Sequence, residues 1–430
     1  MKNPNYTTIK KCRICGNSNL VKVLDFGRRH IGCTPVKSNK NNKLAKIKIP
    51  LVAVLCDRRK NKSACGAVQL LNTVNGDLVY RNIFYRTATN PMMRDAMNNV
   101  VKDCMGKLNL KKDDYVLDIG SNDGTLLTYY PSYLKRIGID PTLNIDFSKL
   151  DPSIKTVTDY FSKKAALKAS DGTLYKAITA IAMFYDLDDP LAFLSEIESS
   201  LALDGIFCVQ MSYLPTSLKT LNFYDVIHEH LLYYTLSVFN HLVEKSNLYI
   251  FDVSFNDVNG GSIRVFLTHK NNVRPVSSEV NKILKTESSM KLSDISTYKE
   301  FSKKIQNLKK VTRQVILNEI KNGSLMIGLG SSNKGNTLLE FFDIDKKLLP
   351  YIGDRNPEKF GLRTVGTDIE LISEEDARKL NPSCMLVLIW FFKDEVLKRE
   401  KEYLEKGGKL LFPMPYPYFV TKDGEKKIDW

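Results

Sequence analysis

The stretch YVLDIGSNDG, residues 115–124, decides the fold of this chain. It begins as a short apolar strand and turns at two glycines, and residues 125–130 then show the apolar spacing that starts a helix. A strand, a glycine-containing turn and a helix bring backbone N–H groups beside a ligand, and glycine is needed where the chain approaches it closely. This stretch therefore predicts a ligand site at the end of a strand.

The next strand carries an acidic residue at the spacing of a nucleoside site. It ends in GIDP, whose Asp140 follows Gly120 by twenty residues. An acidic side chain at this point can accept hydrogen bonds from both ribose hydroxyls. The loop reads Asp118-x-Gly120-x-Asn122-x-Gly124 and lacks the GxGxxG turn that receives a pyrophosphate. We therefore predict a Rossmann-type adenosine site, formed by these five residues, for S-adenosyl-L-methionine (SAM) rather than NAD.

Strand-like segments continue further along the chain. Residues 177–183 and 205–211 are apolar, and a helix is predicted over residues 190–201 between them. Strands that alternate with helices are typical of an α/β fold with an open parallel sheet. Ligands of such sheets lie at the carboxyl ends of the strands.

Four of the eight cysteines form two pairs near the N-terminus, Cys12 with Cys15 and Cys56 with Cys65. Two separated pairs in a reduced compartment indicate a tetrahedral thiolate site for Zn²⁺, and four protein ligands leave no open position for catalysis. The predicted site is therefore structural. The second pair is wider than a CxxC, and Cys33 competes as a ligand. The remaining three, Cys104, Cys208 and Cys384, lie in apolar segments and are predicted to be core thiols.

The charge of the chain is concentrated at its N-terminus. Residues 1–75 hold 16 Lys and Arg against two acidic side chains, which is +14 of the total +15. Such a region attracts polyanions or phosphorylated ligands, or is simply a lysine-rich surface. The longest apolar run, residues 384–392, has nine residues against the ~18 that a membrane span needs. The first residues lack a secretory apolar stretch, so we expect a cytoplasmic protein without a membrane span.

A histidine triplet follows the last predicted strand of the central sheet. His228-Glu229-His230 contains two of the five histidines, and Tyr233 and Tyr234 come directly after it. Imidazole suits proton transfer near neutral pH, and a neighbouring carboxylate can fix its tautomer. Two alternatives remain: packing histidines at a helix start, or a metal site, for which no further ligand has a convincing spacing.

The C-terminal third begins with a connector. Residues 271–297 are polar and predict a linker with some helix. Thr297-x-x-Glu300 then resembles a capping box, and apolar residues recur at helical spacing up to Gly323. One long amphipathic helix is therefore predicted between two domains.

A second αβ unit is predicted after this helix. A strand over residues 324–328 leads into the loop GLGSSNKGNT, residues 328–337. The loop nearly matches a Walker A motif, but Asn336 stands where the phosphate-binding Lys would be, which disfavours ATP hydrolysis. It either cradles a phosphorylated ligand or is only a tight turn. Residues 384–390 are apolar on both faces and fit a central parallel strand.

Read in order, the motifs of the chain resemble the SAM-dependent sugar C-methyltransferase family, which includes the mycarose and tetronitrose 3-C-methyltransferases. The resemblance covers nearly the whole sequence and is carried by the first CxxC, YRNIFYRTATNPMMRD, VLDIGSNDGTLL, GIDP, MFYDLDDP, IHEHLLYY, DVNGGSIRVF and GLGSSNKGNT. It implies three domains, a zinc-binding domain (residues 1–75), a methyltransferase domain (76–270) and a Rossmann-like C-terminal domain (323–430), and the helical connector predicted above lies between the last two (271–322).

The resemblance also implies a reaction. Its substrate is a nucleotide-linked ketosugar that is methylated on the carbon beside the carbonyl. The resemblance supports Cys12, Cys15, Cys56 and Cys65 as the zinc ligands. His230 matches the family's general base, Glu229 its neighbour, and Tyr85 a tyrosine that faces the sugar. Two positions depart from the best-known branch, which has Tyr in place of Ile227 and His in place of Asp186.

The chemistry itself can be stated from general principles. Carbon becomes a nucleophile when a base removes a proton beside a carbonyl and a donor stabilises the enolate oxygen. We expect His230 to be the base and Tyr85, Tyr233 or a water to stabilise the oxygen. An O- or N-methyltransferase would use the same base on a hydroxyl or amine. A zinc-ribbon nucleic-acid-binding protein is a further alternative, but the basic segment lacks the aromatic residues that stack on single strands.

Overall fold

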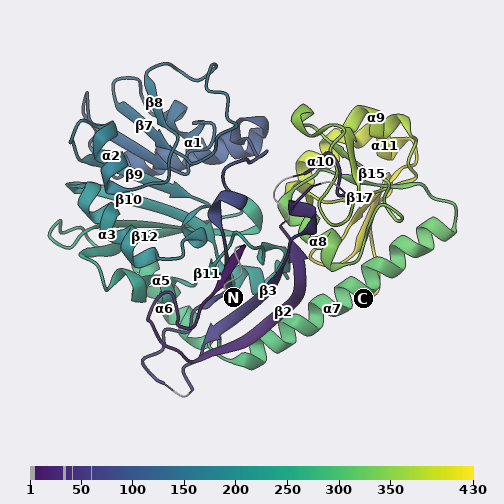
Figure 1. Cartoon of the computed structure of the whole chain (residues 1–430), viewed down its shortest axis with the longest axis horizontal. Helices are drawn as coiled ribbons and strands as arrows, with labels where there is room; N and C mark the ends of the chain where they lie inside the picture. The colour runs from purple at the N-terminus through teal and green to yellow at the C-terminus, as the bar shows by residue number, and fades with distance from the viewer. Residues whose placement is uncertain (1–4, 32–34, 41, 60) are drawn as a thin grey trace.

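The computed structural model describes residues 5–31, 35–40, 42–59 and 61–430. Figure 1 shows two α/β bodies side by side, with strands β2 (Leu20–His30) and β3 (Lys48–Cys56) running between them and helix α7 (Ile295–Lys321) along the lower edge of the view. Cys33, the competing zinc ligand, lies outside the described residues. Within the described residues, no helix is both long and apolar enough to cross a membrane.

A seven-stranded sheet forms the first body, in the order β12-β13-β10-β9-β6-β7-β8. The α/β prediction is confirmed, but the sheet is not wholly parallel: β13 runs antiparallel to both of its neighbours. Only residues 257–261 join β12 to β13, too few for the crossover that parallel strands require. The strands are β6 (Tyr115–Ile119), β7 (Lys135–Ile139), β8 (Ile154–Val157), β9 (Tyr175–Ile181), β10 (Leu201–Ser212), β12 (Leu248–Asn256) and β13 (Ser262–His269).

Six helices belong to this part of the chain: α1 (Pro91–Gly106), α2 (Lys163–Ala169), α3 (Pro190–Ser200), α4 (Leu214–Lys219), α5 (Leu236–Val243) and α6 (Ser278–Ser289). The helix expected from residue 125 is only a short 3₁₀ turn, Leu126–Tyr129. Pro131 explains the difference, because a residue before proline is driven out of the helical region. Tyr130 is indeed extended, at φ −74° and ψ 141°.

The N-terminal strands form a separate four-stranded sheet in the order β11-β4-β3-β2. Three of these strands come from the first 75 residues, but β11 (Leu232–Tyr233) follows the histidine triplet directly. The others are β2 (Leu20–His30), β3 (Lys48–Cys56) and β4 (Val68–Leu70), while β1 (Tyr6–Thr8) pairs with β5 (Asn72–Val74). This pairing joins the histidine triplet to the N-terminal sheet.

The second body begins after α7 (Ile295–Lys321). Asp294 caps this helix by accepting a hydrogen bond from the Ser296 amide at 2.9 Å, so the capping box predicted at Thr297 is wrong. The order of its sheet is β16-β15-β14-β17-β18-β19-β20. Its elements are β14 (Met326–Leu329), α8 (Asn333–Phe341), β15 (Tyr351–Asp354), β16 (Glu370–Ser373), α9 (Glu374–Lys379), β17 (Cys384–Val387), α10 (Lys393–Arg399), α11 (Lys401–Glu405), β18 (Lys409–Phe412), β19 (Tyr418–Thr421) and β20 (Gly424–Lys427).

The N-terminal sheet and the second body share one apolar core. The ring of Phe26 on β2 packs edge-on against Phe341 on α8, with centroids 4.9 Å apart. The neighbouring His30 Nδ1 lies 2.6 Å from Glu340 Oε1. Phe223, which lies shortly before the histidine triplet, stacks on Phe342 at 5.4 Å. The triplet is therefore surrounded by elements from the whole length of the chain.

Candidate active site and metal centre

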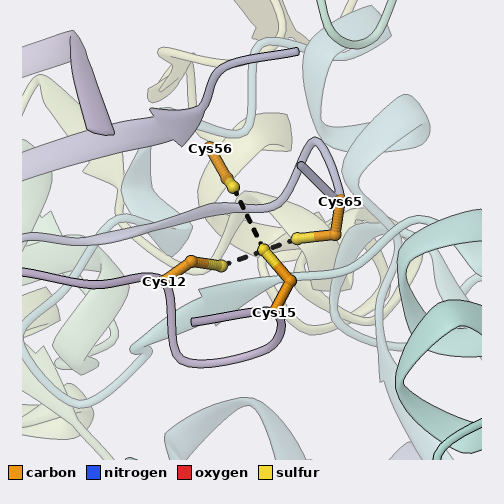
Figure 2. Close-up of side chains that lie close together, drawn as sticks. All are labelled: Cys12, Cys15, Cys56 and Cys65. Atoms are coloured by element: carbon orange, nitrogen blue, oxygen red, sulfur yellow. Dashed lines mark hydrogen bonds between the residues drawn. The ribbon is translucent and has the colours of Figure 1, made fainter. Parts of the chain in front are cut away.

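The four predicted zinc ligands converge at one point. The sulfur atoms of Cys12, Cys15, Cys56 and Cys65 all lie within 4.8 Å of one another, and Figure 2 shows the four side chains pointing inward. Cys12 and Cys65 are 3.5 Å apart and Cys15 and Cys56 are 3.4 Å apart. Tetrahedral Zn²⁺ with bonds of ~2.3 Å holds its sulfurs ~3.8 Å apart, so the cluster fits this metal.

The knuckle between the first two cysteines depends on backbone geometry. Gly16 adopts a positive φ of 73°, and its amide donates to the Cys12 carbonyl at 2.9 Å. A residue with a Cβ would be strained in this conformation. The cysteines predicted to be core thiols, Cys104, Cys208 and Cys384, are buried and unpaired by disulfides.

Arg13 connects this knuckle to the central sheet. Its side chain is almost fully buried, and its Nε lies 2.9 Å from Asp188 Oδ1 in the loop after β9. Its other nitrogens donate to the Leu70 carbonyl at 2.6 Å and the Thr73 hydroxyl at 2.7 Å. Part of the basic N-terminal charge therefore has an internal structural role rather than forming a surface for polyanions.

The predicted SAM loop has the geometry of a nucleoside site. Gly120 and Gly124 adopt positive φ values of 70° and 77°. Asp140 accepts the Asn122 amide at 2.8 Å on one carboxylate oxygen and the Thr142 amide at 2.8 Å on the other. Each carboxylate oxygen has a second lone pair, which leaves capacity for two ribose hydroxyls. The residues present therefore fit SAM.

Asp118 lies within β6, behind this loop. Its Oδ1 accepts a hydrogen bond from the Thr179 hydroxyl at 2.6 Å. Burial, together with the charge of Asp140, raises the pKa of Asp118 to about 7, and the Thr179 hydrogen bond opposes this shift. Asp118 is more deeply buried than Asp140.

The loop also holds the segment that precedes α1. Asn122 Nδ2 donates to the Tyr85 carbonyl at 3.1 Å, and Asn122 Oδ1 accepts from the Thr87 amide at 3.1 Å. Tyr85 is 49% exposed, and its phenol is close enough to Tyr185 to raise the pKa of that tyrosine. The structure thus brings Tyr85 beside the predicted SAM loop.

His230 is buried, and its tautomer is set by one contact. Its Nδ1 lies 2.9 Å from the Asp225 carbonyl oxygen, which can only accept a hydrogen bond. The proton of the neutral ring is therefore on Nδ1, and the lone pair is on Nε2. Burial lowers the pKa of His230 to about 4; the Asp225 charge opposes this and Lys334 adds to it. The imidazole is neutral at pH 7.

Two residues that the sequence analysis did not single out complete this environment. Asp225 Oδ1 forms an ion pair with Lys334 Nζ at 2.7 Å, and both side chains are largely buried. Lys334 is the lysine of the Walker-like loop, and it also donates to the Asn259 carbonyl at 3.2 Å. Its charge is thus paired within the chain, which favours the tight-turn interpretation of that loop. The sequence signal that could have found Asp225 is its position, an acidic residue five positions before the predicted base His230.

His228 faces a different part of the molecule. Its Nε2 lies 3.2 Å from the Ile49 carbonyl of β3, and burial lowers its pKa to about 4. It lines a small cavity between the N-terminal sheet and α8, together with Ile227, Arg29 and Asn336. The two histidines of the triplet therefore point to separate environments.

A group of buried polar side chains lies near His230. The rings of Tyr185 and His230 have centroids 4.1 Å apart. Asp186 and Glu229 are close enough for each to affect the pKa of Tyr233, whose buried hydroxyl has no hydrogen-bond partner among the described residues. Of the predicted catalytic residues, His230, Glu229 and Tyr233 are therefore brought together, with Tyr85 at the neighbouring Tyr185.

Comparisons with known proteins agree with this arrangement. Three family models match successive parts of the chain: a zinc binding domain over residues 12–80, a methyltransferase domain over 92–253 and a C-methyltransferase C-terminal domain over 257–415. C-methyltransferase NovU of Streptomyces niveus is 27% identical over 421 residues, which cover 96% of this chain and 98% of NovU.

Two further proteins match a smaller share of the chain. The tRNA U34 carboxymethyltransferase of Campylobacter lari is 30% identical over 122 residues, 27% of this chain and 40% of that protein. The solved N-methyltransferase NodS of Bradyrhizobium japonicum is 14% identical with a TM-score of 0.31, over 42% of this chain and 97% of NodS. Because the three family models together span nearly all of the sequence and NovU aligns from end to end, the chain is a SAM-dependent methyltransferase of the C-methyltransferase family, with a zinc-binding domain at its N-terminus.

Proposed function

We propose that this enzyme methylates carbon in a nucleotide-linked ketosugar, by removing a proton beside the carbonyl and transferring the methyl group of SAM to the resulting enolate. The observation that carries the proposal is the state of His230. A neutral imidazole whose Nδ1–H is held by the Asp225 carbonyl presents its Nε2 lone pair as a base. A C–H beside a carbonyl requires such a base.

The positions of the two reactants follow from the sheet. Asp140 and the loop from Gly120 to Gly124 would hold the adenosine of SAM, which supplies an electrophilic methyl group. A Cβ added at Gly120 would lie 3.2 Å from Met183, so the loop packs against the end of β9. Two residues further along is Tyr185, whose ring contacts His230. With this placement the end of β9 would lie between the methyl donor and the base, and proximity would contribute much of the rate.

The zinc site supports this arrangement without taking part in the reaction. Four thiolates would saturate Zn²⁺ and leave no position for a substrate. Arg13, inside the first cysteine pair, holds Asp188 next to the end of β9. We therefore assign the metal a structural role that fixes the loop beside the substrate.

The substrate class rests on the family resemblance and on the location of the base. His230 is enclosed by the N-terminal sheet, the central body and α8, a setting suited to a small molecule rather than a polymer. A direct test incubates the enzyme with methyl-labelled SAM and a panel of nucleoside-diphosphate 4-keto-6-deoxyhexoses. We expect one member to gain a methyl group, located on carbon by NMR. A methyl group on oxygen or nitrogen would instead establish the alternative O- or N-methyltransferase.

A further inference from the structure

Asp186 occupies a central position in the proposed active site. It is the last residue of the 3₁₀ turn Phe184–Asp186, which follows β9 at the carboxyl edge of the sheet. The residue before it, Tyr185, contacts the His230 ring. Asp186 therefore lies at the edge where the substrate must meet both the methyl donor and the base.

One carboxyl oxygen of Asp186 has an unusual environment. Asp186 Oδ1 is shielded from solvent and has no hydrogen-bond partner among the described residues. The hydroxyl of Tyr233 is in the same situation. Leaving a buried polar atom unpaired is costly, so both atoms are suited to a polar group that a substrate brings.

We propose that Asp186 is a catalytic residue that acts as a neutral carboxylic acid and donates a hydrogen bond to the carbonyl oxygen of the ketosugar while His230 removes the neighbouring proton. This inference rests on the proposed function. It assigns the carbonyl-polarising role to a residue that departs from the best-known branch of the family.

The charges around Asp186 favour its neutral form. Burial raises its pKa well above the usual range, the nearby Glu229 raises it further, and a hydrogen bond from Tyr80 opposes the shift. Lys334, the basic side chain that acts on His230, already forms an ion pair with Asp225. Tyr185 and Tyr233 are uncharged, because burial raises the pKa of each phenol. Two ionised carboxylates at Asp186 and Glu229 would repel each other.

The proposed step balances. His230 Nε2 takes the proton from the carbon, and the electrons of that C–H bond form the enolate. The Asp186 proton stays on its own oxygen and shares a hydrogen bond with the enolate oxygen. The carbon then attacks the SAM methyl group, the S–CH₃ bond breaks, and S-adenosylhomocysteine and the ketone form. His230 releases its proton to water. An ionised Asp186 would repel the developing negative charge at the same point.

The test compares three variants with the wild-type enzyme. Asp186→Asn retains a hydrogen-bond donor of the same shape, and Asp186→Ala removes it. Asp171→Asn is the matched control, since Asp171 lies in the exposed turn that precedes β9, at the opposite end of that strand. Exchange of the sugar's proton with solvent deuterium is measured with S-adenosylhomocysteine bound, and methyl transfer with SAM. The sugar is the panel member that the wild-type enzyme methylates.

We expect Asp186→Asn to keep both rates within about tenfold of wild type and Asp186→Ala to lower both by about 10² to 10³-fold. Wild-type turnover should fall at high pH as Asp186 ionises, and this fall should be absent in Asp186→Asn. Affinity for SAM, measured by calorimetry, should be unchanged in both variants, which shows that they fold. Equal losses in the two variants would mean that a carboxylate is needed, and full activity of Asp186→Ala would mean that the residue has no role; either result overturns the inference.

Failure of the proposed function gives a different pattern. In that case the wild-type enzyme itself exchanges no carbon-bound proton, or its product carries the methyl group on oxygen or nitrogen. The Asp186 inference fails alone when wild-type exchange and C-methylation are present but the two variants behave alike.

Discussion

Lys334 Nζ lies 2.7 Å from Asp225 Oδ1, and through this contact the second α/β body holds the loop that carries the predicted base. The same Asp225 accepts the His230 Nδ1–H on its backbone carbonyl. Asp225 therefore forms an ion pair with α8 through its side chain and fixes the tautomer of the His230 imidazole through its backbone carbonyl. Lys334 is a positioning residue in this arrangement.

Replacing Lys334 should therefore alter the acid limb of the pH profile. Lys334→Met leaves the buried Asp225 charge unpaired, which should lower the free energy of unfolding by ~3 to 5 kcal/mol. It also removes a charge that lowers the pKa of His230, so turnover should begin to fall at a higher pH than in wild type. Lys334→Arg should restore part of the lost stability and part of the wild-type pH profile. The double variant Asp225→Asn, Lys334→Met should do the same. An unchanged pH profile in an active Lys334→Met enzyme would contradict the positioning role.

The base itself gives a second prediction. His230→Ala should lower turnover by ~10² to 10⁴-fold and leave SAM affinity nearly intact, because the residue acts in proton transfer and not in donor binding. The pKa of about 4 means that wild-type turnover falls only as the pH drops toward 4. His228→Ala should matter less, since His228 faces the Ile49 carbonyl. Full activity of His230→Ala would exclude its role as the base.

Asp140 should control SAM binding. Asp140→Ala removes the acceptor for the Asn122 and Thr142 amides as well as for the ribose. Charged hydrogen bonds contribute ~1.5 to 3 kcal/mol each, so calorimetry should show affinity weakened by at least about tenfold. Asp140→Asn keeps one carbonyl acceptor and should have an intermediate effect. Unchanged affinity in Asp140→Ala would place the cofactor elsewhere.

The cysteine cluster predicts that each chain binds one zinc ion. Elemental analysis of the purified enzyme should find this ratio, and Cys56→Ser should lower both zinc content and the melting temperature. Activity should fall only to the extent that the protein unfolds, because the metal has no open position. Cys384→Ser is the control, since Cys384 lies in the distant β17. A stable, active enzyme without stoichiometric metal would contradict the assignment.

Acid sensitivity should come partly from the buried histidines. Burial lowers the pKa of both His228 and His230 to about 4, below the ordinary value near 6.5. The unfolded chain therefore binds more protons between these values, and the stability of the fold is complete above pH 6.5 and falls as the pH drops toward 4. Over this pH range, each histidine contributes at most roughly 3 kcal/mol to the loss in the free energy of unfolding. The free energy of unfolding, measured with denaturant at several pH values, should depend less steeply on pH in His228→Gln than in the wild type. An equal dependence would contradict His228 as a source of the acid sensitivity.

The sequence predicted the features that depend on local pattern. The alternation of apolar strands and helices, the glycine loop before Asp140 and the spacing of the cysteine pairs all follow from short segments. The features it missed depend on contacts across long separations. Asp225 and Lys334 are 109 positions apart, and neither stands in a motif that indicates their pairing. The reversal of β13 was missed because no strands were predicted over residues 248–256 and 262–269, although Asn259-Gly260 between them is a hairpin signal. The domain boundaries and the roles of the site residues remain predictions.

The two-residue strand β11 makes the position of the proposed base depend on the docking of the N-terminal sheet. Leu232 and Tyr233 pair with Gln69 and Val68 of β4, so the main chain just after His230 is anchored to the segment beside the zinc cluster. The adenosine loop, in contrast, belongs to a sheet whose strands all follow residue 114, although the core of that sheet includes Cys12, Cys56 and Cys65. The zinc-binding segment therefore packs into the core of the sheet that would bind the cofactor and also anchors the main chain of the proposed base.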